Sequence, residues 1–307
     1  MFGRIKKMRC SLKILLFVLF CAVSLEASSL SMIEREESDR KIRLITTTFS
    51  DYFPIGYMAT DKTGSKYPRS VFQDSFDNVF AKEKFKTEFI SYPNSEEAIS
   101  AVRVGNADVF FGMYYATDEY SGIEYVYPAA LNNPVHLIMV PEKISKITNT
   151  DVLKSLRGIY SKQEYFSDFV IKHFKNLNMT PVETTDKAYE MLLTDQADYI
   201  LGAYYYNYGQ VLEKGLTGYL SFSKKSLWNM PLFIGLSKFL ENKSAIALRI
   251  KNAVSMPEFK ESVDKNLRKM IQELEEQTQG TVPPKYVRTP IEGELTPADE
   301  PLKGENP

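Results

Sequence analysis

The sequence predicts an α/β protein of two lobes, each a mainly parallel sheet flanked by helices, with two crossover strands joining the lobes. Three observations predict this class. One helix–strand unit occurs at residues 95–112 and again at 185–202, a strong strand pattern lies near the middle of the chain, and another lies in its last third. Repeated helix–strand units favour parallel sheets, and the two other strands are placed to pass between lobes.

The repeated unit has the same order of features in both copies. A Ser or Thr able to cap a helix is followed by an acidic residue, apolar residues at helical spacing, an Ala-Asp pair, and a short apolar run that suits a buried parallel strand. The alternative is chance, since helix–strand units recur in any α/β protein. The matched positions are Ala98/Ala188, Ala107/Ala197, Asp108/Asp198 and Gly112/Gly202.

A tyrosine pair follows the glycine in each copy, Tyr114-Tyr115 in the first and Tyr204-Tyr205 in the second. Ligands of open α/β sheets gather at the carboxyl ends of the strands, so the pairs are placed to line a cleft between the lobes. Adjacent residues of a strand point to opposite faces. We therefore expect at most half of these side chains to touch a ligand.

Nothing in the composition marks the chain as a nucleic-acid binder. The 307 residues carry 38 basic and 39 acidic side chains, for a net charge of −1, without the basic excess typical of such proteins. Aromatic residues make up 13 % of the chain, including 19 Tyr and 19 Phe. Tyrosines at strand ends suit recognition of a small ligand by flat, amphipathic side chains.

The first 27 residues have the pattern of a cleaved secretory signal peptide. Basic residues precede an apolar run at 14–23, and the small residues Ser24 and Ala27 offer cleavage positions. A membrane anchor is the alternative, but the run is too short to span a bilayer stably. Residues 28–40 are polar and charged, and we expect them to form a flexible lead-in.

Both cysteines, Cys10 and Cys21, fall within this presequence. Phe20 stands where a bacterial lipid-attachment site requires a small residue, so no lipid anchor is expected at Cys21. The processed chain then has no cysteine and no disulfide. This pattern fits a periplasmic protein that relies on its apolar core.

Residues 41–134 are assigned to the first lobe. Its first strand, 41–47, opens into a loop that holds Tyr52, Phe53 and Tyr57 among Pro and Gly turn signals. Because the loop follows a strand directly, we expect it at the same sheet edge as the tyrosine pairs. The other elements are a helix at 70–84, a strand at 87–91 and the first repeated unit.

Residues 135–230 are assigned to the second lobe, which begins with a crossover strand at 135–140. A short helical connection at 143–157 leads to a strand and then to a helix that starts near Ser161 or Lys162. The second repeated unit completes this lobe.

The chain returns to the first lobe over residues 231–276. The run 232–236 forms the second crossover strand, residues 242–254 are helical, and a long helix after Pro257 carries an apolar stripe. Residues 277–307 are polar and rich in proline, and we expect that tail to be disordered.

These features resemble the periplasmic solute-binding proteins of ABC importers, specifically the type 2 fold of the polar amino-acid family, over residues 41–275. The resemblance implies a clamshell that closes on a small ligand by a hinge motion near Asn133-Pro134 and Met230-Pro231. It is carried by Tyr52-Phe53-Pro54, Gly105 with Ala107-Asp108, Gly112, Thr117, Tyr127-Pro128, Ala197-Asp198 and Phe233-Ile234-Gly235-Leu236.

The sequence departs from that family where the family reads the charges of an amino acid. Tyr120 stands in place of the arginine that would hold the ligand carboxylate through a bidentate pair. No acid occurs at 202–205, where the family places an aspartate for the ammonium group. These departures argue against an ordinary α-amino acid as ligand, and leave Arg69 or Lys162 as candidate carboxylate partners.

The candidate ligand-binding residues lie on the aromatic loop, at the two strand ends and at helix starts. Backbone N–H groups near Ser161 or Thr117 suit an anion. No cofactor and no metal are expected, because no His/Cys cluster has ligand spacing. The residues are Tyr52, Phe53, Tyr57, Arg69, Met113, Tyr114, Tyr115, Thr117, Ser161, Lys162, Tyr165, Tyr204 and Tyr205.

Patterns that indicate catalysis are weak. His136 and His173 are interpreted as structural or surface residues, and Asp108 and Asp198 as turn residues at strand starts rather than an acid/base pair. No Gly-x-Ser-x-Gly elbow or phosphate-binding loop occurs. We therefore expect no catalytic residues and no enzymatic activity.

The favoured function is an exported, monomeric binding protein that captures a small polar or aromatic solute for the membrane subunits of an ABC importer. One alternative is an exported cleft enzyme of the dehydratase type that acts on a small cyclic acid, with Glu164 or Asp118 as its acid. Another is a ligand-sensing or scaffold protein that uses its tyrosine-rich surface and proline-rich tail.

Overall fold

The centre of the molecule is a nine-stranded sheet in the order β5-β1-β6-β12-β7-β10-β8-β9, with β11 paired to β7, and a separate sheet β2-β3-β4 lies beside it. The computed structural model describes residues 42–49, 51–80, 85–114, 122–144, 147, 149–164, 166, 168–177 and 179–285. The strands are β1 Ile42–Phe49, β2 Asp51–Tyr52, β3 Gly56–Thr60, β4 Lys66–Arg69, β5 Phe85–Tyr92, β6 Val109–Tyr114, β7 Ile123–Met139, β8 Gly158–Ser161, β9 Thr180–Val182, β10 Tyr199–Ala203, β11 Ser221–Phe222 and β12 Trp228–Ser237.

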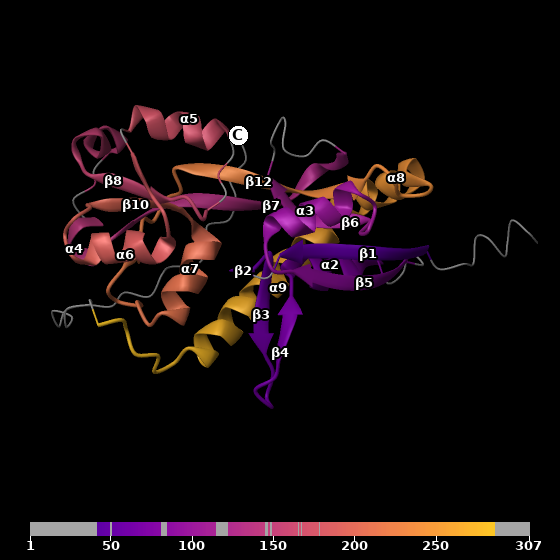
Figure 1. Cartoon of the computed structure of the whole chain (residues 1–307), viewed down its shortest axis with the longest axis horizontal. Helices are drawn as coiled ribbons and strands as arrows, with labels where there is room; N and C mark the ends of the chain where they lie inside the picture. Colours follow the sequence, from indigo (N-terminus) through magenta and orange to yellow (C-terminus); the bar gives the residue numbers. More distant parts are fainter. Residues whose placement is uncertain are drawn as a thin grey trace, which may run out of the picture.

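The large sheet has a parallel section at each end. β1 pairs in parallel with β5 and β6, whereas β8 pairs in parallel with β9 and β10. Between them lie β7 and β12, which are antiparallel to each other and to their outer neighbours. Figure 1 shows the two sections on either side, with β7 and β12 running between them. The predicted two-lobed α/β class is confirmed, and we call the β1/β5/β6 section the first lobe and the β8/β9/β10 section the second.

Helices cover both lobes. The longest, α9, buries a stripe at intervals of three and four residues that includes Phe259, Val263 and Leu267, and it packs against α2. Its last turn reaches the second lobe, where the Tyr208 hydroxyl donates to Glu275 at 2.6 Å. The helices are α2 Val71–Phe80, α3 Ser95–Arg103, α4 Pro141–Ile144, the short 3₁₀ helix Thr150–Ser155, α5 Asp168–Asn176, α6 Thr185–Leu193, α7 Tyr204–Glu213, α8 Lys243–Val254 and α9 Pro257–Gln277.

The first crossover is one 17-residue strand, β7, rather than the short strand at 135–140 that the sequence predicts. Its two prolines read as breaks in the sequence, since proline cannot donate to a strand ladder. In the structure Pro134 is paired with Asn229, and Pro128 lies where the register between β7 and β12 shifts. The strand therefore continues past both prolines and carries Asn133 between the lobes.

The repeated unit forms the predicted helix and strand in both lobes, α3–β6 and α6–β10. Each helix is capped one residue earlier than the sequence predicts. Asn94 accepts from the Glu97 N–H at 2.9 Å and Thr184 from the Lys187 N–H at 3.1 Å. Thr185 is therefore free of the capping role, and its side chain is buried.

The glycines that end the two units allow close approach of other segments. Gly112 has a left-handed backbone (φ +84°), and a Cβ there would collide with Ile55 of the aromatic loop. At Gly202 a Cβ would collide with the side chain of Asn207 on α7. Each glycine thus lets a neighbouring segment lie directly against the end of its strand.

The predicted aromatic loop after β1 contains the small β2-β3-β4 sheet. In β3 the buried Tyr57 and Ala59 flank the exposed Met58, which is the alternation of a strand with one covered face. Tyr52 and Phe53, just before β3, contact the second lobe at Tyr206 and Gly209. Residues 206 and 209 lie three apart on one face of α7, so this face receives the loop.

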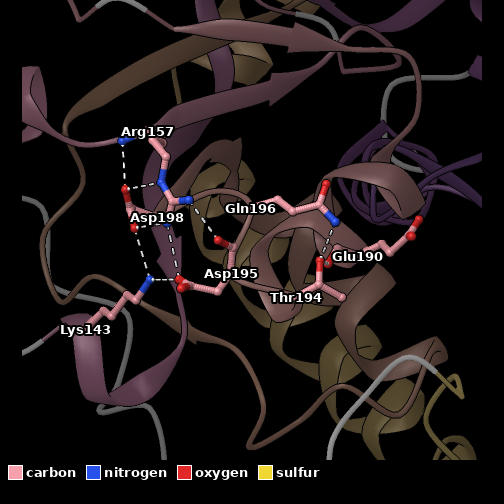
Figure 2. A network of polar contacts seen from close by, with 7 residues as sticks. All are labelled: Lys143, Arg157, Glu190, Thr194, Asp195, Gln196 and Asp198. Atoms are coloured by element: carbon pink, nitrogen blue, oxygen red, sulfur yellow. Dashed lines mark hydrogen bonds and ion pairs between the residues drawn. The ribbon is translucent and has the colours of Figure 1, made fainter.

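The start of β10 is held by ion pairs (Figure 2). Asp198 accepts from the backbone N–H of Arg157 at 2.9 Å, from its guanidinium at 2.9 Å, and from Lys143 at 3.0 Å. Asp195 pairs with the same two cations. The hydrogen bonds from Arg157 hold the pKa of Asp198 well below its usual range. Asp198 is therefore a turn residue that fixes the base of the second lobe, in keeping with the sequence interpretation.

Several predictions concern residues outside the described part of the chain. The signal peptide (1–27), the lead-in (28–40), and residues 286–307 of the tail are among them. The first tail residues, 278–285, are described, and Thr281 lies against Gly215 after α7. Within the described ranges, no helix combines the length and the apolar character that crossing a bilayer requires.

Candidate functional site

A buried cluster of polar and aromatic side chains lies where the two lobes meet. The first lobe contributes from the aromatic loop and the end of β6, the crossover strand β7 contributes from its middle, and the second lobe contributes from β8, α6 and α7. The cluster is named the interlobe cluster below. Its residues are Tyr52, Tyr114, Asn133, Ser161, Glu164, Thr185, Tyr206 and Asn207, all of them buried.

Two tyrosines join the lobes. The ring of Tyr52 stacks on that of Tyr206, with centroids 4.6 Å apart and planes at 15°. The Tyr52 and Tyr114 hydroxyls are 3.3 Å apart, and the Asn133 side-chain N–H donates to Tyr114 at 2.8 Å. Stacked aromatic pairs contribute roughly 0.5–1.5 kcal/mol beyond their burial, so this contact favours the closed arrangement of the lobes.

The second lobe continues the polar chain. The Tyr206 and Thr185 hydroxyls are 3.2 Å apart, and Thr185 donates to Ser161 Oγ at 3.1 Å. The backbone N–H of Thr185 donates to Gln163 at 3.0 Å, and the Gln163 N–H donates to Ser161 Oγ at 3.1 Å. The turn after β8, which carries Glu164, is thereby tied to the start of α6.

Glu164 is a buried carboxyl group with one oxygen unpaired. Its Oε2 accepts from the Ala203 N–H at 2.7 Å. The Asn207 side chain also donates a hydrogen bond to the carboxyl group. Its Oε1, like Oδ1 of Asn133, accepts no hydrogen bond from any described residue. Burial raises the pKa of Glu164 to about 8, although the two hydrogen bonds act in the opposite direction.

The phenols of the cluster stay protonated at physiological pH. Burial raises the pKa of Tyr206 to about 12, and it raises those of Tyr52 and Tyr114 further. Each hydroxyl therefore retains a proton to donate as well as lone pairs to accept. The arrangement suits hydrogen bonding to a polar guest and offers no ionised phenol.

Three of the predicted ligand-binding residues, Tyr52, Tyr114 and Ser161, meet in this cluster. Phe53 lies next to it, packed against Gly209 of α7 and in edge contact with Tyr57. These placements agree with the predicted position of the aromatic loop, and contact with a ligand stays a prediction for each of them.

Four other predicted residues have different surroundings. Met113 is fully buried against Gly235 of β12. Arg69 forms ion pairs with Asp74 and Glu273, and the exposed Lys162 pairs with Glu183 at 2.6 Å. Both cations therefore already have carboxylate partners. Tyr57 is buried on β3, where Arg69 is its register partner on β4.

The tyrosine pair of the second lobe lies away from the cluster. Tyr204 stacks on Tyr208 with ring centroids 5.5 Å apart. It makes an edge contact with Phe222 at 5.1 Å and a tilted contact with His136 at 5.0 Å. Tyr205 is half-buried beside it. Tyr115, Thr117 and Tyr165 are outside the described residues, as is Asp118.

Sequence reasoning missed Asn133, Thr185, Tyr206 and Asn207 as members of the cluster. The three consecutive tyrosines at 204–206 could have indicated Tyr206. In a helix that begins at Tyr204, the side chain of Tyr206 points to a different face from that of Tyr204. Glu164 was named only as a candidate acid of the alternative enzyme and was otherwise expected at the solvated surface, whereas the structure buries it in the cluster.

Among the residues that the structure describes, no group suggests a metal site. Among the described residues, no three His, Cys, Asp or Glu side chains are grouped as metal ligands would be. His136 is half-buried, its Nδ1 lies 2.7 Å from the Ser223 carbonyl oxygen, and burial lowers its pKa. Its surroundings fit the predicted structural role, whereas the side chain of His173 lies outside the description.

Two solved structures with this architecture carry the names of ABC transporter binding proteins. An amino acid ABC transporter substrate-binding protein from Streptococcus pneumoniae, bound to L-arginine, has a TM-score of 0.56 and 13 % identity over 78 % of this chain and 95 % of its own. A putative ABC transporter binding component from Wolinella succinogenes, complexed with lysine, has a TM-score of 0.56 and 16 % identity over 74 % of this chain and 94 % of its own. This chain has the two-lobed type 2 periplasmic-binding-protein fold.

The same fold also occurs in a protein that is not named as a transporter component. The VFT2 domain of BvgS from Bordetella pertussis has a TM-score of 0.55 and 11 % identity, over 74 % of this chain and 92 % of that domain. No protein-family model matches the sequence, and no curated protein sequence matches it. At these identities the likeness establishes the fold, and the ligand has to be argued from the site.

Proposed function

We propose that the protein is an exported solute-binding protein that captures a small polar or aromatic solute between its lobes for an ABC importer. The observation that carries the proposal is the interlobe cluster, to which both lobes contribute. It combines stacked tyrosines with two buried oxygen atoms, on Glu164 and Asn133, that no described residue satisfies.

Unsatisfied buried polar atoms are rare in folded proteins, since each costs roughly 1–3 kcal/mol. A guest with matching donors would recover that free energy when the lobes close over it. The hydrogen bonding of Glu164 and Asn133 would thus be complete only with a ligand bound. This is the physical basis of a binding function for this fold.

Closure requires the two crossover strands to bend together. The proposed hinge points lie at Asn133-Pro134 on β7 and Met230-Pro231 on β12. Met230 is the register partner of Asn133, so the hinge points are paired on adjacent strands. The proposed lobe boundaries, 41–134 with 231–276 and 135–230, follow from these points. Motion there would separate Tyr52 from Tyr206 and open the cluster.

Export and transport complete the proposal. The basic and apolar pattern of residues 1–27 supports a cleaved signal peptide, and the absence of cysteine after Cys21 supports a periplasmic location. The named transporter proteins with this fold support a membrane partner. We propose that the protein acts as a monomer, since the site needs the two lobes of one chain.

Binding is favoured over catalysis. Glu164 has the raised pKa of a general acid, but the three similar structures described above carry the names of binding proteins or of a BvgS domain and none is named as an enzyme. A ligand-sensing role is the second candidate, because the BvgS domain shares the fold without being named as part of a transporter.

The proposal is tested by thermal-shift screening of the purified exported protein against a metabolite library, with native mass spectrometry of the hits. A ligand that binds the folded state raises the melting temperature. Recovery of the ligand chemically intact supports binding, whereas turnover supports the enzyme. The proposal fails if no compound binds, or if binding is unaffected by both Tyr52→Ala and Tyr206→Ala.

A further inference from the structure

We propose that the solute is a cationic amine without a carboxylate, bound through its N–H groups to Glu164 and Asn133. This inference rests on the proposed binding function and concerns the chemistry of the ligand. It begins from the two unpaired atoms in the interlobe cluster, Glu164 Oε1 and Asn133 Oδ1. Asn133 Oδ1 is an acceptor, and so is Glu164 Oε1 once the carboxyl is ionised, so the partner that satisfies both atoms together is a donor that also favours the ionised carboxylate.

The amide donors of the cluster are already committed. The Asn133 N–H group donates to Tyr114, and the Asn207 N–H group bonds to the Ala203 carbonyl oxygen and to Glu164. Tyr189 donates in turn to the Asn207 side-chain oxygen at 2.8 Å. An ammonium group brings three donors and a guanidinium five, and neither brings an acceptor that would need a partner. A cation therefore matches what this site lacks.

The charge balance of the site points the same way. The cluster contains one carboxyl group and no Lys, Arg or His. Among the described residues, the titratable groups that interact with Glu164 from the packed elements are the phenols of Tyr52 on β2, Tyr114 on β6 and Tyr206 on α7. Phenols stay neutral in this range and their rings attract cations. An ionised Glu164 would thus receive its counter-charge from the guest.

The two basic residues that the sequence offered as carboxylate partners form ion pairs outside the cluster. Arg69 is held by Asp74 and Glu273, and Lys162 by Glu183. Residues 115–121, which link β6 to β7 along the chain, include Asp118 and Glu119 and have no Lys or Arg in their sequence.

A ligand carboxylate would therefore meet the negative charge of Glu164 without a compensating cation in the described cluster. Like charges at close range in a buried site are strongly unfavourable. An α-amino acid would bring such a group, and its decarboxylated amine would not. The site thus discriminates between these two classes of compound.

The protonation of Glu164 links this recognition to pH. The free carboxyl, with a pKa of about 8, is mostly protonated at pH 7, and pairing with a cation requires it to lose that proton. Amine binding then releases a proton. The affinity for a permanently charged amine rises close to tenfold from pH 6 to pH 7 and levels off above pH 8.

The test compares each amino acid with its own decarboxylated amine by isothermal titration calorimetry on the purified exported protein. The pairs are arginine with agmatine, lysine with cadaverine, and tyrosine with tyramine. At least one amine is expected to bind ten or more times more tightly than its parent amino acid. Glu164→Gln, which keeps the shape of the side chain, is expected to reduce that affinity at least tenfold.

A matched control is Glu183→Gln, which removes an exposed carboxylate near the start of α6 and leaves amine affinity unchanged. If Glu164→Gln fails to fold, the proposal is tested instead by the pH profile of agmatine binding to the unmodified protein. A rise of less than threefold between pH 6 and pH 7 contradicts the proposal.

The inference is overturned if a parent amino acid or another carboxylate binds more tightly than the amines, or if Glu164→Gln binds them normally. A neutral or anionic solute whose binding is lost in Tyr206→Ala but retained in Glu164→Gln would overturn the proposal of a cationic ligand. The proposed binding function would still stand. Absence of binding by any library compound would instead refute the binding function itself.

Discussion

Both copies of the repeated unit end with a glycine and a tyrosine pair, but the tyrosine side chains lie in different places in the two lobes. After Gly112, strand β6 continues through Tyr114, and that side chain reaches the interlobe cluster. After Gly202, β10 ends at Ala203 and α7 begins at Tyr204, so the chain turns by about 100° per residue instead of alternating between faces. Tyr204 then points to Phe222 and Tyr208, and Tyr206 takes the interlobe position.

The lobes also divide the chemistry of the site. The first lobe contributes phenols, from Tyr52 and Tyr114, whereas the second contributes one phenol, from Tyr206, together with the carboxyl group of Glu164 and the hydroxyls of Ser161 and Thr185. The same helix–strand unit thus supports a mainly aromatic wall on one side and a mainly polar wall on the other.

The largest expected effect separates the two glycines. Gly112→Ala forces a left-handed residue to carry a Cβ that collides with Ile55, and we expect it to lower the free energy of unfolding by about 3 kcal/mol or more. Gly202→Ala adds a collision with Asn207 without the positive φ, and is expected to cost about 1–3 kcal/mol. Urea denaturation measures both.

The two glycine variants also differ in what they do to the site. Gly202→Ala displaces Asn207, which bonds to Glu164, so its ligand affinity falls even where it is folded. An equal loss of stability in the two variants, or normal affinity in Gly202→Ala, would contradict the different roles assigned to these positions.

The next effect distinguishes Tyr206 from Tyr204. Tyr206→Ala removes the ring that stacks on Tyr52, and is expected to weaken ligand binding by about 1–3 kcal/mol. Tyr204 lies two residues earlier, on the other face of α7, and Tyr204→Ala is expected to change the ligand affinity by less than about 0.5 kcal/mol. Calorimetric titration with a ligand from the screen compares them, and a larger loss for Tyr204→Ala would reverse the assignment.

A pH effect of intermediate size isolates Glu164. Its carboxyl keeps its proton up to about pH 8 in the folded protein, but loses it near pH 4.5 when unfolded. Between these values the folded state holds one extra proton, so the free energy of unfolding falls as the pH rises, by about 1.4 kcal/mol per pH unit. Glu164→Gln should remove this slope, and Glu183→Gln should retain it, in urea denaturation series at pH 5, 6, 7 and 8.

The smallest effect concerns a surface ion pair. Lys162 and Glu183 have side chains that are 51 % and 78 % exposed, and exposed pairs contribute roughly 0–1 kcal/mol. Lys162→Ala is expected to change neither stability nor ligand affinity by more than about 0.5 kcal/mol. A substantial loss of affinity would return Lys162 to the ligand site that the sequence suggested for it.

The sequence predicted the fold more fully than the site. Helical spacing, apolar runs and the glycines defined α3–β6 and α6–β10, because these patterns follow from burial on each lobe. The aromatic loop and Tyr114 were also placed correctly at the lobe boundary. The length of β7 was not, since Pro128 and Pro134 look like strand ends until the register with β12 is known.

The second half of the site was harder to predict for a local reason. Ala203 is the N-cap of α7 and makes no side-chain capping bond, so no Ser, Thr, Asp or Asn marks the start of that helix. Without this boundary the tyrosines at 204–206 read as the end of a strand. The contributions of Asn133 and Thr185 depend on contacts between segments far apart in the chain, which no local pattern reveals.

Hydrogen–deuterium exchange of the free and ligand-saturated protein tests the central claim most directly. If the solute is held between the lobes, it should slow exchange together in residues 52–57, in β7 around Asn133, and at Ala203, whose N–H is bonded to Glu164. Protection confined to one lobe, with these three segments unchanged, would contradict capture at the interlobe cluster.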